Sequence, residues 1–176
     1  EKTMNGGVLL IPFLAVRFLL PPAFDSAALR RAAYFAPMQG AERLAYGVYQ
    51  ISNTGIFLYL FFLKISAALS WPFCAGAACY GIGLCLLSAS LVAFSRPDCG
   101  KMKETGLYRL SRNPMYVAYF ICFLGMALLT RSVLLFGLVA VFQISAHWVI
   151  LAEERWCLEQ FGERYRRYMG KVRRYI

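Results

Sequence analysis

The chain has 176 residues, of which 60% are hydrophobic and 16% aromatic, and its net charge is +10. A soluble domain with a mean hydropathy of +0.54 would expose too much apolar surface, so the composition excludes an ordinary globular protein. The charges are clustered and whole stretches lack them, which argues against nucleic acid as a partner and favours basic segments beside anionic lipid headgroups. We therefore expect an all-α, polytopic membrane protein that contacts membrane lipids.

Hydropathy predicts about five transmembrane helices, because one bilayer crossing needs ~20 mainly apolar residues. Their approximate ranges are 7–24, 44–70, 73–94, 115–129 and 133–152. The first is interrupted by Arg17 and by Pro21-Pro22, and the fourth has room for only about 15 residues. The last two spans are separated by a short turn and are predicted to form a helical hairpin.

The distribution of Lys and Arg predicts which side of the membrane each loop occupies. Five spans place the basic residues between spans one and two, between spans three and four, and after span five on the same side. The positive-inside rule makes that side, with the C-terminus, cytosolic. After residue 152, "EERWCLEQFGERYRRYM" alternates apolar and charged residues, which predicts an amphipathic tail helix on the membrane face.

Polar residues in and after the fifth span are candidates for function. One helical face carries Gln143, His147 and Glu154. The uncharged Gln143 and His147 are either hydrogen-bonded to neighbouring helices or part of a site. A carboxylate is costly in a membrane, so Glu153 and Glu154 are expected to pair with Arg112 or Arg174, or to face a cationic ligand. The alternative is a solvated helix end.

The segment "RNPMY", residues 112–116, predicts the start of a helix at the same membrane face. Pro114 lacks an N–H and suits a first helical turn, and Asn113 before it is expected to cap that helix. A helix N-terminus favours carboxylates and other anionic groups. A zwitterionic ligand would suit this terminus together with the two glutamates.

Other short motifs have mainly structural interpretations. A polar patch at Gln50, Asn53 and Thr54 either joins neighbouring helices or lines a headgroup pocket. "YGIG", residues 80–83, is interpreted as a packing device, since the chain has no P-loop or dinucleotide fingerprint. Six cysteines without a CxxC pair and a single histidine give no basis for expecting a metal site.

The C-terminal half resembles a known family of membrane enzymes. "GLYRLSRNPMY", a short hairpin and then "EERWCLEQFGERYRRYMGKVRRY" look like the integral-membrane methyltransferases related to isoprenylcysteine carboxyl methyltransferase and phospholipid N-methyltransferases. The resemblance covers roughly residues 95–176, which we expect to form the methyltransferase core with cofactor loop, hairpin and tail. Residues 1–94 match only as about three N-terminal transmembrane helices.

The resemblance implies an S-adenosylmethionine-dependent methyltransferase acting on a lipophilic, membrane-embedded acceptor, with the cofactor pocket closed by the C-terminal tail. The cofactor-binding residues that it implies are Gly100, Lys101, Met102, Lys103, Tyr108, Asn113, Pro114, Met115, Tyr116, Glu153 and Tyr165. Tyr168 and Arg174 belong to the tail over the site. The catalytic residues expected are His147, Glu154 and Arg174, with His147 or Glu154 as a base.

Two departures from the family pattern leave the acceptor open. Asn113 stands where the carboxyl methyltransferases have His, and the last span lacks an Arg, with Val149 at about that position. A prenylcysteine carboxylate, a lipid amine and a thiol are all compatible acceptors. Two other classes also remain, an NADPH-dependent reductase of the sterol-reductase type and a non-catalytic membrane protein that keeps the fold. Cofactor identity separates the methyltransferase from the reductase, and loss of S-adenosylmethionine binding would favour the non-catalytic protein.

Overall fold

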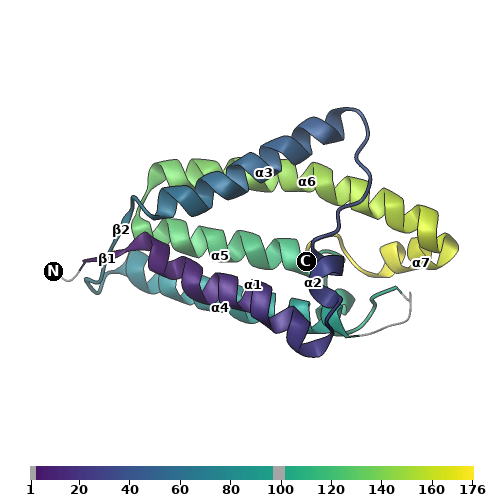
Figure 1. Ribbon diagram of the computed structural model, residues 1–176, viewed down its shortest axis with the longest axis horizontal. Coiled ribbons are helices and arrows are strands. Elements are labelled where there is room, and N and C mark those ends of the chain that lie inside the picture. The colour runs from purple at the N-terminus through teal and green to yellow at the C-terminus, as the bar shows by residue number, and fades with distance from the viewer. Residues whose placement is uncertain (1–2, 97–101) are drawn as a thin grey trace.

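Helices dominate the computed structural model, which describes residues 3–96 and 102–176 (Figure 1). The helices are α1 (Leu10–Phe24), α2 (Ala28–Ala32), α3 (Ala41–Leu60), α4 (Trp71–Ser95), α5 (Pro114–Thr130), α6 (Val133–Phe161) and α7 (Glu163–Lys171). The other elements are the 3-10 turns η1 (Gly6–Leu9) and η2 (Gly106–Arg109) and the strands β1 (Thr3–Asn5) and β2 (Lys64–Ser66). The prediction of a mainly helical chain is confirmed.

Three helical segments of the described chain are long and apolar enough to cross a membrane. They are Gly6–Phe24, Trp71–Ser95 and Val133–Phe161. Helix α5 is apolar but has only 17 residues, and α3 has 20 residues with a more polar composition. Membrane crossing by α3 and α5, and hence the count of five spans, stays a prediction.

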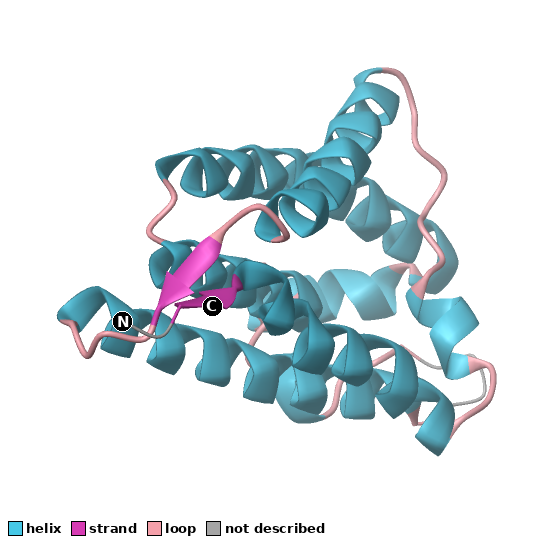
Figure 2. Ribbon diagram, turned by 60° about the vertical axis from the view of Figure 1, so that its left-hand side comes forward, coloured by secondary structure: helices cyan, strands magenta, loops and turns pink. Residues whose placement is uncertain are grey.

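The second predicted span, 44–70, is wrong at its C-terminal end. Helix α3 ends at Leu60, and β2 pairs antiparallel with β1, with Met4 opposite Ile65. Ile65 is buried whereas Lys64 is exposed, so the chain has changed from helical to strand periodicity here. Figure 2 shows this two-stranded ribbon at one end of the helices.

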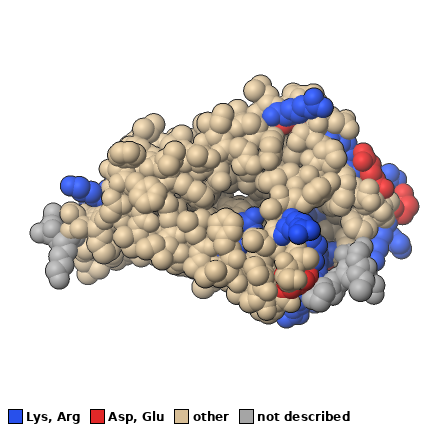
Figure 3. Space-filling view, in the orientation of Figure 1, with Lys and Arg blue, Asp and Glu red and all other residues tan. Residues whose placement is uncertain are grey.

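The long helices form two layers, with α3 and α6 in one and α1, α4 and α5 in the other (Figures 1 and 2). Successive long helices run in opposite directions between the ribbon end and the α7 end. The connections that carry most of the basic residues therefore meet at one end. Figure 3 shows the Lys and Arg side chains gathered there, whereas most of the remaining surface in this view is uncharged.

Helices α4 and α5 are in close contact because glycines remove side chains from their interface. A Cβ added to Gly125 would lie 2.5 Å from the backbone N of Tyr80, and one added to Gly83 would lie 2.7 Å from the backbone N of Cys122. Only glycine permits such an approach. The packing interpretation of "YGIG" is confirmed for Gly83, whereas Gly81 has no neighbour within 4 Å.

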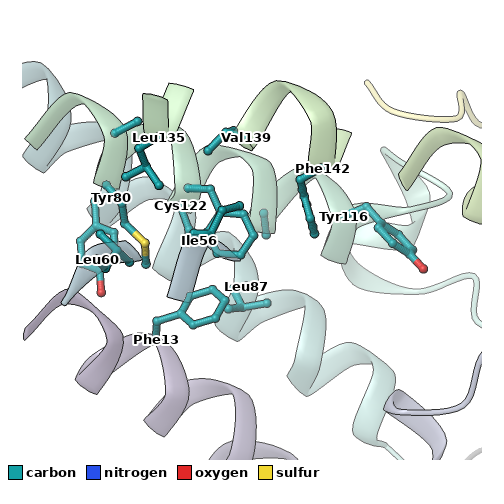
Figure 4. Packing of buried hydrophobic residues seen from close by; sticks show 14 of the residues in the cluster. Phe13, Ile56, Leu60, Tyr80, Leu87, Tyr116, Cys122, Leu135, Val139 and Phe142 are labelled. Atoms are coloured by element: carbon teal, nitrogen blue, oxygen red, sulfur yellow. The ribbon is translucent and has the colours of Figure 1, made fainter. Parts of the chain in front are cut away.

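All the long helices contribute to one apolar core between the two layers (Figure 4). Its labelled members are Phe13, Ile56, Leu60, Tyr80, Leu87, Tyr116, Cys122, Leu135, Val139 and Phe142. Aromatic rings join the layers directly, since the ring centroids of Phe123 and Phe142 are 5.0 Å apart. The core packs the helices tightly toward the ribbon end of the bundle. A functional site is therefore sought at the α7 end.

The tail helix begins later than predicted. Helix α6 continues for 29 residues to Phe161, so Trp156 and Leu158 belong to it and not to a separate tail helix. The break occurs at Gly162, whose φ of 52° is strained for other residues. Helix α7 then covers Glu163–Lys171 with one apolar and one charged face. Its location on a membrane surface stays a prediction.

Candidate functional site

A cavity of about 900 Å³ lies between the two helix layers toward the charged end. Helices α1, α2, α3, α5, α6 and α7 all contribute to its wall. Figure 3 shows a hollow on this face between the α3 and α1 sides of the molecule. Ligand pockets have volumes of roughly 300–1,000 Å³, so this cavity lies near the upper end of that range.

Most of the residues predicted to bind the cofactor line this cavity. They are Met102, Lys103, Tyr108, Asn113, Pro114, Met115, Tyr116, Glu153 and Tyr165. Glu154 and Tyr168 line it as well. Gly100 and Lys101 lie outside the described residues. The motif at residues 112–116 and the glutamates at the end of α6 are far apart in the sequence, but both line this cavity.

Glu153 presents a carboxylate to the cavity. Tyr116 donates a hydrogen bond from its hydroxyl to Oε1 of Glu153, with an O–O distance of 2.8 Å. This bond joins the start of α5 to α6 across 37 residues of sequence. No salt bridge links Glu153 to any other residue that the structure describes. Its carboxylate can therefore accept further hydrogen bonds from a ligand.

Glu154, the next residue, is held by two arginines. Its Oε1 is 3.0 Å from Nη2 of Arg112, and its Oε2 is 3.0 Å from Nη2 of Arg174. Nε of Arg174 also donates to Oε1 at 3.2 Å, so that contact is bidentate. The Glu154 side chain is only 5% exposed, and a buried carboxylate needs such partners. The predicted pairing with Arg112 or Arg174 is confirmed, with both arginines engaged.

The C-terminal tail, residues 172–176, is bound to the loop before α5. The backbone N–H of Arg112 donates to the carbonyl of Arg173 at 2.9 Å. Asn113 donates from Nδ2 to the carbonyl of Arg174 at 3.1 Å. The expectation that Asn113 caps α5 with its side chain is wrong, because this amide is used to bind the tail. Asn113 therefore joins the loop before α5 to the C-terminal tail through a hydrogen bond.

Two tyrosines of α7 close the same end of the cavity. Tyr168 donates from its hydroxyl to the carbonyl of Tyr108 at 2.5 Å, and the rings of Tyr165 and Tyr168 are 5.8 Å apart. Burial raises the pKa of Tyr168 to about 12 and also raises the pKa values of Tyr108 and Tyr165. These hydroxyls therefore stay protonated and neutral at physiological pH.

A family model for phospholipid methyltransferases matches residues 74–164, just over half of the chain. The chain belongs to the phospholipid methyltransferase family. The match runs from α4 through the site residues on α5 and α6 into the start of α7. No curated protein matches the sequence. Membership agrees with the resemblance inferred from the motifs, and it makes this cavity the candidate active site of a membrane methyltransferase.

Two residues expected to be catalytic in this methyltransferase do not line the cavity. His147 has its Nδ1 2.5 Å from the hydroxyl of Tyr175, which places it against the C-terminal tail. Arg174 contacts Glu154 at the edge of the site. Glu154 lines the cavity, but its oxygens are already occupied by guanidinium groups. The structure therefore assigns these three residues to contacts that position the tail, and a role as base stays a prediction without geometric support.

Part of the cavity wall was not predicted from the motifs. This part of the wall is formed by Arg17 from α1, by Tyr49, Gln50 and Asn53 from α3, and by Tyr119 from α5. The sequence did carry signals for Arg17, Gln50 and Asn53. Arg17 is a charge inside an apolar span, and the polar patch on α3 left a headgroup pocket open as one interpretation. Thr54 of that patch is exposed, so only its other two members face the cavity.

Proposed function

We propose that the protein transfers a methyl group from S-adenosylmethionine to a lipophilic acceptor that enters from the membrane. The observation that carries the proposal is the single continuous cavity. One part of its wall is formed by the family motifs around Tyr116 and Glu153, and another part by apolar and aromatic residues of α1 and α3. One space can thus hold a polar cofactor beside a lipid.

The residues that would hold the cofactor are those around Glu153. Its carboxylate can accept hydrogen bonds from hydroxyl or ammonium groups, and the rings of Tyr108 and Tyr116 can face a cation. When bound, S-adenosylmethionine supplies a methyl group on an electrophilic sulfonium. Tyr165 and Tyr168 exclude water from this part of the cavity, which favours a displacement that depends mainly on orientation.

The charged end of the molecule would face the cytosol under the positive-inside rule. A water-soluble donor then enters from that side, while a lipid acceptor reaches the cavity from the bilayer. The acceptor is a prenylcysteine-like carboxylate, an amine or a thiol, and the family match supports only a lipid-type acceptor in general.

The first test is calorimetric titration of detergent-purified protein with S-adenosylhomocysteine. The wild type should bind saturably, and Glu153→Gln should bind at least roughly tenfold more weakly because a hydrogen bond to a charged group contributes about 1.5–3 kcal/mol. The matched control is Glu159→Gln, an exposed glutamate on the same helix, which should bind as the wild type does.

Absence of binding to folded wild-type protein would overturn the proposal, and NADPH would be the next ligand to titrate. Equal affinities of the Glu153→Gln and Glu159→Gln variants would leave cofactor use intact but remove Glu153 from the site. Circular dichroism of each variant establishes that it is folded.

A further inference from the structure

Arg17 is a charged residue in the middle of an apolar, membrane-spanning segment. Its Nη2 donates to the carbonyl of Ala32 in α2 at 3.2 Å. Its Nη1 is buried and has no hydrogen-bond partner among the described residues. A charged side chain within a span costs ~2.5–3.5 kcal/mol on insertion scales, so such a residue is retained for a function more often than for stability.

The other arginines on the cavity wall are neutralised by the protein itself. Arg31 forms a salt bridge with Asp25 at 2.5 Å, and Arg112 forms one with Glu154 at 3.0 Å. Arg17 has no carboxylate partner in residues 3–96 and 102–176. Its positive charge is therefore available to a ligand in the cavity.

An aromatic wall connects Arg17 with the Glu153 part of the cavity. Tyr116, which is bonded to Glu153, has its ring 6.2 Å from that of Tyr49. Tyr119 lines the cavity beside Tyr116, and its ring lies 5.7 Å from that of Phe13, one turn before Arg17 on α1. A carboxylate and a guanidinium thus lie in one cavity, separated by rings that suit a hydrocarbon chain or a reacting group.

We propose that Arg17 binds an oxyanion, a carboxylate or a phosphate, on the lipid acceptor. The proposal rests on the proposed methyl transfer and specifies its substrate class. A guanidinium binds carboxylate and phosphate oxygens through paired N–H donors. Arg17 lines the cavity, and its charge has no carboxylate partner among the described residues. Gln50 and Asn53 on α3 add neutral hydrogen-bonding groups to the same wall. The apolar side chains of Phe13 and Phe57 then contact the hydrocarbon part of the acceptor.

The test compares three amphiphiles with the same saturated twelve-carbon tail, lauryl phosphate, laurate and lauryl alcohol. Binding is measured in a neutral maltoside detergent by tryptophan fluorescence, since Trp156 lines the same cavity. The detergent takes up each amphiphile equally for every variant, so differences between variants report on the protein. The wild type should bind at least one anionic amphiphile roughly tenfold more tightly than the alcohol.

Arg17→Gln should lose this preference, and Arg17→Lys should retain part of it because the charge remains. Arg30→Gln is the matched control, since it removes an exposed arginine from α2 and leaves the cavity wall unchanged. A preference for the phosphate identifies a phospholipid-like acceptor, and a preference for laurate identifies a carboxylate lipid. Either result supports the proposal.

Equal binding of all three amphiphiles by the wild type would overturn it, as would an unchanged preference in Arg17→Gln. Titration with S-adenosylhomocysteine separates this inference from the proposed function. Loss of the anion preference in Arg17→Gln with normal nucleoside binding is the expected result. If Arg17→Gln fails to fold, Arg17→Lys decides the question, because its preference should be smaller than that of the wild type and an unchanged preference would overturn the proposal.

Discussion

Helix α5 has two sides that are held in place by different physical means. Toward α4 its backbone lies against a neighbouring backbone, because Gly125 and Gly83 leave no side chain between the helices. Toward α6 its first turns face a cavity, where Tyr116 donates a hydrogen bond to Glu153. Arg112, in the loop just before α5, forms an ion pair with Glu154. Close packing makes one side rigid, and polar contacts allow the other side to enclose a space.

The polar side should show the largest effect of a single substitution. Glu154→Gln removes the carboxylate shared by Arg112 and Arg174 and leaves a buried guanidinium without its charged partner. Breaking such a buried pair costs about 3–5 kcal/mol. We expect this loss in reversible denaturation of the detergent-solubilised protein, together with faster proteolysis of the C-terminal tail.

The control for that experiment is Glu163→Gln. Its partner Arg166 is 73% exposed, so losing this pair should cost no more than about 1 kcal/mol. If both substitutions destabilised the protein equally, the ion pairs of Glu154 would not be what binds the tail.

The packed side should show an intermediate effect. Gly125→Ala places a methyl group 2.5 Å from the backbone of Tyr80, and overpacking of this kind costs about 1–3 kcal/mol. We expect a lower free energy of unfolding with unchanged affinity for S-adenosylhomocysteine, because the cavity lies on the other side of α5. Gly81→Ala on α4 is the control, since no atom lies within 4 Å of the added methyl group. Unchanged stability of Gly125→Ala would show that the two helices can separate without loss.

The smallest effect is expected for Tyr168→Phe, which removes one hydrogen bond to the carbonyl of Tyr108 and should cost about 0.5–1.5 kcal/mol. The pKa of Tyr168 is raised from 10.0 to about 12, so its contribution is complete below pH 10 and declines as the pH rises toward 12. Unfolding curves at pH 8 and pH 11 should therefore differ less for Tyr168→Phe than for the wild type. Tyr34→Phe, at an exposed tyrosine, should retain the wild-type difference.

The sequence was sufficient for features that depend on local composition or on the cost of burying charge. Hydropathy located α4 and α5 to within about two residues, because an apolar run has few other stable conformations in a membrane. The expense of a carboxylate near a span predicted cationic partners for Glu154, and both candidates bind it.

Features that depend on tertiary contact could not be predicted in this way. Asn113 has good capping chemistry, but the tail carbonyl of Arg174 competes successfully for its amide. Residues 64–66 look apolar enough to continue a span, but β1, some 60 residues earlier, supplies strand partners. The sequence also could not predict that the polar face of α3 lines the cavity. Periodicity shows that one face of a helix is polar, but it does not show which part of the protein that face contacts.

The unequal lengths of α5 and α6 have a consequence for the position of the site. At 1.5 Å per residue, the 29 residues of α6 extend roughly 43 Å and the 17 residues of α5 roughly 25 Å, against a hydrocarbon thickness of about 30 Å. One helix is too long for the hydrocarbon layer and its neighbour is too short. The short helix is covered by its neighbours, because no residue of α5 is exposed. Tyr116 in the first turn of α5 is bonded to Glu153, so the last two turns of α6 extend beyond the start of α5. The site therefore forms where the short helix begins and the long helix continues past it.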